Sequence, residues 1–222
     1  MLRFPGVYRP QADTALLAEA AAAAPIPPGA RVLDLCTGSG ALAVTAARLG
    51  AGGVTAVDVS RRAVISVRLN AWARGLPVRA RRGSLVEPLS AASGRVSADG
   101  PYDVVLANPP YVPGPSATAP TGRERAWDGG PDGRTVLDPF CAAAPGLLSG
   151  TGFVLLVQSH VSGVQRSLVM LREGGLRASV VARRRVPFGP VMRAQAAYLE
   201  DSGLVRPGQR HEDLVVIRAG HR

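Results

Sequence analysis

Asn108 and the two prolines after it are the residues of this 222-residue chain whose types and spacing most clearly suggest chemistry. They follow an apolar run, residues 102–106, which predicts a buried parallel strand with Asn108 at its carboxyl end. Open α/β sheets bind ligands at that edge. The carboxamide offers an acceptor and a donor, while the prolines present carbonyls from stiff backbone. Such a corner can hold a planar substrate NH2 group, although an ordinary strand-ending turn would use the same residues.

Two other strand ends predict a ligand site at the same edge. The predicted strand at residues 31–35 runs into a glycine-rich turn, residues 37–40, whose free N–H groups favour electronegative ligand groups. The predicted strand at residues 54–58 ends in Asp58, whose carboxylate can accept both ribose hydroxyls of an adenosine. A glycine-rich turn alone is shared by nicotinamide, flavin and methyl-donor proteins, and Asp58 could also be a plain helix cap.

The remaining segments alternate between predicted helices and strands. A first helix is expected to run to about residue 24 with Asp13 or Thr14 as its cap. Further helices are predicted at residues 41–49, 61–74, 136–148 and 161–173, and further strands at residues 78–82, 152–157, 176–186 and 214–217. This alternation predicts an α/β fold in a single domain over residues 1–222.

Three segments of that domain are expected to be more than scaffold. Residues 1–28 form an N-terminal segment and helix, and the proline- and glycine-rich residues 113–132, with Trp127, predict an active-site loop. Residues 189–204 lie between the last two strands and predict one inserted amphipathic helix. Its apolar face is expected to pack on the domain, with a partner interface as the alternative. That face would consist of Val191, Ala194, Ala197, Tyr198 and Leu204.

Composition narrows the setting. The net charge is +10 with no lysine, which favours an anionic partner such as nucleic acid but also fits a compositional bias of the source genome. Two cysteines cannot make a disulfide framework, so a reducing cytoplasm is expected. The histidines show no metal-ligand spacing, and no metal is expected. No apolar run approaches the roughly 20 residues that span a bilayer, so no membrane association is expected.

The glycine turn, Asp58 and the Asn-Pro-Pro-Tyr run at residues 108–111 together resemble the class I methyltransferases that use S-adenosyl-L-methionine. Within that superfamily the chain resembles the HemK family of protein N5-glutamine methyltransferases, in the short form known from release-factor modification in eukaryotes and archaea. The matching segments are residues 8–14, 108–113, 127–134 and 212–217. The resemblance implies a Rossmann-like, seven-stranded, mostly parallel sheet with an antiparallel last strand and helices on both faces.

The resemblance also implies site residues. The donor would be bound by Thr14, Asp34, Cys36, Gly38, Gly40, Asp58, Ser84, Leu85 and Asn108. The substrate would be bound by Asn108, Pro109, Pro110, Tyr111 and Trp127, with Asn108, Pro109 and Tyr111 as the catalytic group. Cys36 stands where the family usually has its first glycine, and Ser84 where it usually has an aspartate for the adenine amino group. Ser84 predicts weaker donor binding, because a neutral hydrogen bond is weaker than a charge-assisted one. The two departures bear on donor affinity more than on activity.

The resemblance implies methyl transfer to a glutamine side chain in a protein, expected to be a release factor of translation termination, with S-adenosyl-L-homocysteine as the product. A small zinc-binding activator protein is a partner that short-form relatives often use. Two alternatives stay open at this level. Asn-Pro-Pro-Tyr also serves enzymes that methylate exocyclic base amines of rRNA, tRNA or DNA, or, as a minor variant, a lysine. The departures at Cys36 and Ser84 would also suit a non-catalytic, donor-binding or scaffold subunit.

Overall fold

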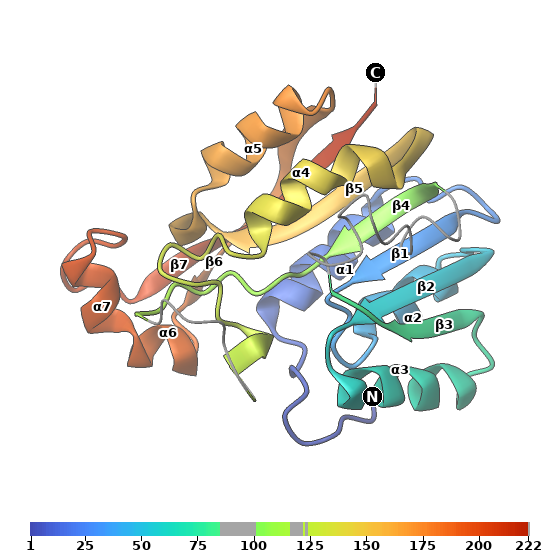
Figure 1. Ribbon diagram of the computed structural model, residues 1–222, viewed down its shortest axis with the longest axis horizontal. Helices are drawn as coiled ribbons and strands as arrows, with labels where there is room; N and C mark the ends of the chain where they lie inside the picture. Colours follow the sequence, from blue (N-terminus) through green and yellow to red (C-terminus); the bar gives the residue numbers. More distant parts are fainter. Residues whose placement is uncertain (85–100, 116–121, 123, 222) are drawn as a thin grey trace.

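The computed structural model describes residues 1–84, 101–115, 122 and 124–221, which include one seven-stranded sheet (Figure 1). The strand order is β3-β2-β1-β4-β5-β7-β6. The strands are β1 (Arg31–Leu35), β2 (Gly53–Asp58), β3 (Val78–Arg82), β4 (Tyr102–Ala107), β5 (Leu148–Ser159), β6 (Arg177–Pro187) and β7 (His211–Gly220). Only β7 runs antiparallel to its neighbours, β5 and β6, which confirms the predicted topology.

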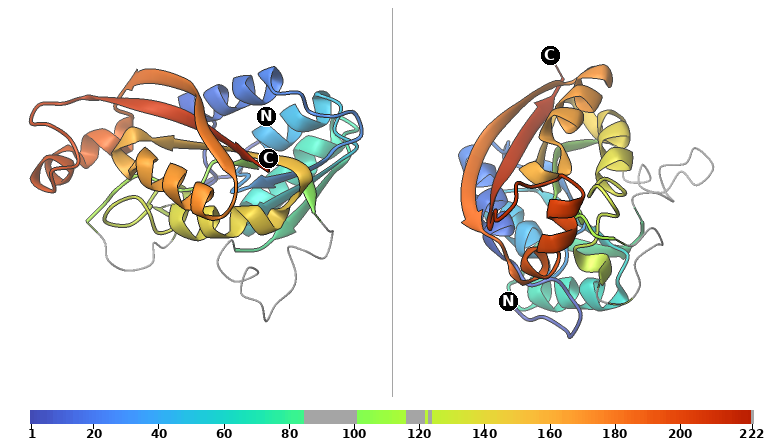
Figure 2. Two further views of the ribbon diagram at one scale, coloured as in Figure 1. Left: turned by 90° about the horizontal axis from the view of Figure 1, so that it is seen from above. Right: turned by 90° about the vertical axis from the view of Figure 1, so that its left-hand side faces the viewer.

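Helices cover both faces of the sheet, as predicted (Figure 2). The helices α1 (Ala12–Ala23), α2 (Ala41–Arg48) and α3 (Arg61–Trp72) lie on one face, and α4 (Leu137–Leu147) and α5 (Val164–Glu173) on the other. Two short 3-10 helices, η2 (Glu124–Ala126) and η3 (His160–Ser162), lie in the connections. None of the described helices is long and apolar enough to cross a membrane.

The central strands β1 and β4 are buried on both faces, and this fixes the positions of their carboxyl ends. Residues 104–107 of β4 and 32–35 of β1 are fully or almost fully buried, since both faces of these strands are covered. Leu17 of α1 packs from one side and Phe140 of α4 from the other, both without exposed surface. Burial of each such side chain contributes about 1.5–3 kcal/mol. The buried apolar side chains on both faces therefore hold the ends of β1 and β4 side by side.

The start of α1 differs from the prediction. The N-cap is Gln11, so Asp13 and Thr14 lie inside the first turn and the expectation that one of them caps the helix is wrong. Both side chains are buried. The physical reason is that the Asp13 carboxylate accepts hydrogen bonds from two tyrosines outside the helix, Tyr8 and Tyr111.

The inserted segment forms two short helices, α6 (Pro190–Ala194) and α7 (Ala196–Asp201), where one was predicted. The break at Gln195 shifts the helical phase, so Ala194 and Ala197 are exposed while Met192 and Leu199 are buried. The buried side chains form a second small core, Val161, Phe188, Met192, Leu199 and Val205, hereafter the second core. Its contacts with the rest of the domain confirm that the segment packs on the domain itself.

Candidate active site

A cavity of about 810 Å³ opens at the carboxyl ends of β1, β2, β3 and β4. This is the sheet edge that the sequence predicted, and the volume is typical of small-molecule sites. The N-terminal segment contributes Tyr8 and Asp13 to the wall, and the loop after the corner contributes Trp127. One chamber is therefore built from segments more than 100 residues apart in the sequence.

Asp58 links the end of β2 to the glycine turn. Its Oδ2 accepts from the Gly38 N–H at 2.9 Å, and its Oδ1 accepts from the Ser60 N–H at 2.9 Å. Burial raises the pKa of Asp58, while these backbone hydrogen bonds act in the opposite direction. Each oxygen keeps a further lone pair, so the carboxylate can still accept two hydroxyl groups from the cavity side.

The glycine turn divides its residues between ligand and scaffold. Cys36 and Gly38 line the cavity, and both have positive φ angles, near +57°. Gly40, with φ +84°, does not line it; a Cβ there would lie 3.1 Å from the Val67 side chain of α3. Gly40 thus allows α2 and α3 to approach closely, whereas Gly38 presents backbone to the cavity.

Asp34 lies beneath this turn and is fully buried. Its Oδ2 accepts from the Thr37 hydroxyl at 2.5 Å and from the Ala43 N–H at 2.9 Å, which ties β1 to the start of α2. Its Oδ1 has no partner among the described residues. Burial raises the pKa of Asp34 to about 7, against the effect of the two hydrogen bonds. Asp34 is not part of the cavity lining, so its expected contact with the donor stays a prediction.

The Asn108 side chain is oriented from the N-terminal helix. Its Nδ2 donates to the Thr14 hydroxyl oxygen at 3.3 Å, and that hydroxyl donates to Asp13 Oδ1 at 3.2 Å. One of the two N–H groups of the carboxamide is thereby used, and none of the described residues donates a hydrogen bond to the carboxamide oxygen. The oxygen is left available as an acceptor at the cavity.

Asp13 is the site residue that sequence reasoning missed. Its Oδ2 accepts from the Tyr8 hydroxyl at 2.7 Å and the Tyr111 hydroxyl at 3.1 Å, and its Oδ1 also accepts from the Thr14 N–H. Burial and the Asp13 charge raise the pKa of Tyr111 well above its ordinary value, so Tyr111 stays a neutral donor. The sequence did contain a signal, because one tyrosine precedes Asp13 closely and another lies in the Asn-Pro-Pro-Tyr run. The interpretation of Asp13 as a helix cap did not take these tyrosines into account.

A second buried acid, Glu212 at the start of β7, interacts electrostatically with Asp13. Its Oε2 has no partner among the described residues. Burial raises the pKa of Glu212, and the Asp13 charge adds to that shift.

The loop after the corner is held against it. The Val112 N–H donates to the Trp127 carbonyl and the Gly129 N–H donates to the Val112 carbonyl, both at 2.9 Å, around a bridge between Val112 and Asp128. Trp127 is half-buried and lines the cavity. The predicted placement of Trp127 beside the corner therefore agrees with the structure.

Most of the predicted site residues meet at this cavity. Those that line it are Cys36, Gly38, Asp58, Ser84, Asn108, Pro109, Pro110, Tyr111 and Trp127. Thr14 does not line the cavity but bonds to Asn108, which does. Asp34 lies beneath the glycine turn, and Gly40 faces α3. Leu85 lies outside the described residues. Within the described part of the chain, no group of three or more His, Cys, Asp or Glu side chains could hold a metal ion.

The cavity suits S-adenosylmethionine. Asp58 offers acceptors for a diol, the Gly38 turn allows close backbone approach, and the volume suits a nucleoside-sized ligand together with a substrate side chain. The orphaned Asp34 oxygen lies just behind the turn that would receive the methionine part.

Comparisons with known proteins agree with this geometry. Residues 14–109 match the family model of ribosomal protein L11 methyltransferase. A Methanocaldococcus jannaschii protein named as a protein N5-glutamine methyltransferase is 30% identical over 189 residues, covering 85% of this chain and 90% of that protein. The release factor glutamine methyltransferase of Mycolicibacterium smegmatis is 36% identical over 145 residues, covering 63% of this chain but only 50% of its own length.

Among solved structures, a chain of the E. cuniculi Mtq2-Trm112 complex, described as methylating the eRF1 translation termination factor, matches with a TM-score of 0.63. It is 23% identical, and the match covers 98% of this chain and 99% of that one. This likeness supports the fold. Because the Methanocaldococcus relative matches over nearly its whole length, the chain belongs to the S-adenosylmethionine-dependent family of protein N5-glutamine methyltransferases.

Proposed function

We propose that this protein transfers a methyl group from S-adenosylmethionine to the side-chain nitrogen of a glutamine in a peptide-chain release factor, within a Gly-Gly-Gln loop. The observation that carries the proposal is the Asn108 carboxamide, whose nitrogen is bonded to Thr14 and whose oxygen remains an acceptor at the cavity. The names of relatives support a glutamine in a release factor as the acceptor.

A glutamine amide is a poor nucleophile because its nitrogen lone pair is delocalised into the carbonyl. Asn108 Oδ1 and the Pro109 carbonyl would accept hydrogen bonds from the two amide N–H groups and turn the lone pair towards the donor. S-adenosylmethionine supplies an electrophilic methyl group on a sulfonium. With the donor bound, the nitrogen would attack the methyl carbon, and the carbon–sulfur bond would break with its electrons staying on sulfur.

The nitrogen needs no strong base before transfer. Once methylated it is cationic and acidic, so it can lose a proton late to water or a nearby acceptor. Positioning in a near-attack geometry can supply about 7–11 kcal/mol, more than any single hydrogen bond in the site.

Asp13 would strengthen the clamp indirectly. Its charge polarises the Thr14 hydroxyl, which accepts from the Asn108 amide nitrogen, and hydrogen bonds in such a chain reinforce one another. The carboxamide oxygen at the far end becomes a better acceptor for the substrate N–H. Tyr8 and Tyr111 hold the same carboxylate from the other side.

The test is a methyl-transfer assay with labelled donor and three acceptors: a release factor, the same factor with Gln replaced by Glu in its Gly-Gly-Gln loop, and rRNA. We expect a mass increase of a single methyl on the Gln form alone. Label confined to rRNA would overturn the protein-substrate proposal in favour of a base amine. Absence of both donor binding and transfer would support the scaffold alternative.

The Asn108→Ala variant should lower kcat on the release factor about 100-fold while changing the donor Kd little, because positioning of the amide is lost. Gln11→Ala removes an exposed carboxamide that donates to the Tyr8 hydroxyl oxygen and does not line the cavity. It serves as the control, with kcat close to wild type. Steady-state kinetics and calorimetry measure the two quantities. An unchanged kcat in Asn108→Ala contradicts the clamp.

A further inference from the structure

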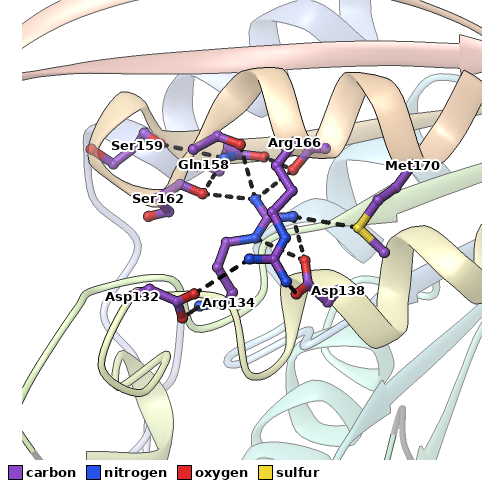
Figure 3. A network of polar contacts seen from close by, with 10 residues as sticks. Asp132, Arg134, Asp138, Gln158, Ser159, Ser162, Arg166 and Met170 are labelled. Carbon is purple, nitrogen blue, oxygen red and sulfur yellow. Dashed lines mark hydrogen bonds and ion pairs between the residues drawn. The ribbon is translucent and has the colours of Figure 1, made fainter. Parts of the chain in front are cut away.

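Arg134, at the end of the loop, carries a charge that is almost completely buried, with 3% of its surface exposed. Its Nε and Nη2 donate to Asp138 Oδ1 at 2.8 and 2.6 Å, and its Nη1 donates to the Ser162 carbonyl at 2.7 Å (Figure 3). The Nη1 also donates to the Ser167 hydroxyl oxygen at 2.8 Å. A buried charge is tolerated only when it is paired and fully hydrogen-bonded. The guanidinium therefore fixes α4, α5 and η3 relative to one another.

The backbone of Ser162 is held from two sides. Its carbonyl accepts from Arg134 and, at 3.3 Å, from the Gln158 Nε2 (Figure 3). The Gln158 Oε1 in turn accepts from the Ser167 hydroxyl at 2.6 Å. Gln158, Ser162 and Ser167 have 1% exposure or less, so water does not compete for these hydrogen bonds.

The Ser162 side chain reaches the catalytic corner. Its hydroxyl donates to the Tyr111 backbone carbonyl at 2.6 Å. Gly133 closes the contact, since a Cβ there would lie 2.4 Å from the Tyr111 carbonyl oxygen and 2.9 Å from the Ser162 hydroxyl oxygen. The carbonyl of Tyr111, the hydroxyl of Ser162 and the backbone of Gly133 are thus packed together without space for another atom.

We infer that Ser162 is a positioning residue for the methyl-transfer corner, and that the hydrogen bonds of its carbonyl with Arg134 and Gln158 hold it in place. The corner is fixed at Asn108 by β4 and at Tyr111 by Ser162, and the two prolines between them transmit any displacement as a rotation of the Pro109 carbonyl. The inference rests on the proposed function, because the carbonyl of Pro109 matters only if it receives the substrate amide.

Two buried serines of this network allow a matched comparison. Ser162→Ala removes the hydroxyl that contacts the corner. Ser167→Ala removes one that contacts Arg134, Gln158 and Cys141, and it leaves both hydrogen bonds to the Ser162 carbonyl in place. Both leave a buried partner without a hydrogen bond, so both should lower the Tm by similar amounts. We expect Ser162→Ala to lower kcat on the release factor about 10-fold with an unchanged donor Kd, and Ser167→Ala to keep kcat within about twofold of wild type.

Hydrogen exchange of the segment 108–114 gives a readout that does not need turnover. It should become faster in Ser162→Ala and stay as in wild type in Ser167→Ala. Equal kcat and equal exchange in the two variants would overturn the inference and leave a merely structural role. Failure of the wild-type protein to methylate any release factor would instead refute the proposed function, with the exchange comparison still deciding whether Ser162 holds the corner.

Discussion

At the scale of single residues, Asp13 and Cys36 show how local rules and the site interact. Asp13 gives up a cap position and accepts hydrogen bonds from Tyr8, Thr14 and Tyr111, so its carboxylate joins the N-terminal segment to the corner. Cys36 has a left-handed backbone conformation, φ +57°, which residues other than glycine rarely adopt. Both residues line the cavity, and the backbone of Cys36 is locally unfavourable.

Asp13→Asn should lower kcat about 10-fold. The substitution keeps the shape but removes the charge, and hydrogen bonds to a charged acceptor are worth about 1.5–3 kcal/mol each. Kinetics on the release factor, with thermal unfolding as a check on folding, measure the effect. The matched control is Glu19→Gln, an exposed acid of the same helix that pairs with Arg184. Equal activity in the two variants would show that the Asp13 charge plays no part.

Cys36→Gly should raise the free energy of unfolding by up to about 1 kcal/mol. It relieves a left-handed conformation that costs roughly 1–2 kcal/mol, minus the entropy that glycine adds to the unfolded chain. Donor binding should also tighten, because a side chain leaves the cavity wall. Calorimetry and denaturant unfolding test both effects. Cys141→Ala, a buried cysteine away from the cavity, should lose stability without tightening donor binding.

At the scale of elements, the corner depends on the loop that follows it. Val112 exchanges backbone hydrogen bonds with Trp127 and Gly129, and Gly133 packs against the Tyr111 carbonyl. The loop therefore lines the candidate site and also supports the corner.

Gly133→Ala should reduce both stability and kcat, because a methyl group 2.4 Å from the Tyr111 oxygen must displace the corner. Gly75→Ala is the matched control. Gly75 also has a positive φ, +60°, but a Cβ there would meet nothing within 4 Å, and Gly75 does not line the cavity. It should lose about 1 kcal/mol through backbone strain while retaining kcat. If Gly133→Ala keeps full kcat, the corner tolerates displacement.

The sequence predicted the elements better than their contacts. Apolar runs and glycine-rich turns predicted β1, β2, β4 and their common edge. They did so because a short continuous apolar run is the typical sequence pattern of a buried parallel strand. The strand β7 is longer than predicted, since pairing on both sides stabilises ends that lack an apolar pattern. The roles of Asp13 and Ser162 depend on Tyr111, which lies 98 and 51 residues away from them, and periodicity cannot reveal such contacts.

At the scale of the whole molecule, buried acids make stability depend on pH. The pKa of Asp34 is raised from 3.8 to about 7 by burial, so the folded protein holds this proton more tightly than the unfolded chain does. The resulting stabilisation is fully present below about pH 4 and is lost as the pH rises through about 7. Burial raises the pKa of Asp58 and Glu212 as well, in the same sense.

The free energy of unfolding of the ligand-free Asp34→Asn variant should therefore change less between pH 4 and pH 7 than that of wild type. Asparagine can still accept from Thr37 and Ala43, so the turn should keep its shape. Urea unfolding at a series of pH values measures the slope, and Asp58 and Glu212 should account for part of what remains. An identical slope in both proteins would exclude Asp34 as a source of the pH dependence.

The position of β7 in the sheet has a consequence for biosynthesis. β7 lies between β5 and β6, yet it follows both along the chain. On a translating ribosome, β6 has no strand to pair with until residues 211–220 have emerged, and β5 exposes its hydrogen-bonding edge until then. Strands β1 to β5 can pair beforehand. The nascent chain therefore passes through a stage at which the strands that surround the cavity are already paired. At that stage the hydrogen-bonding edge of β5 is still open and prone to aggregation.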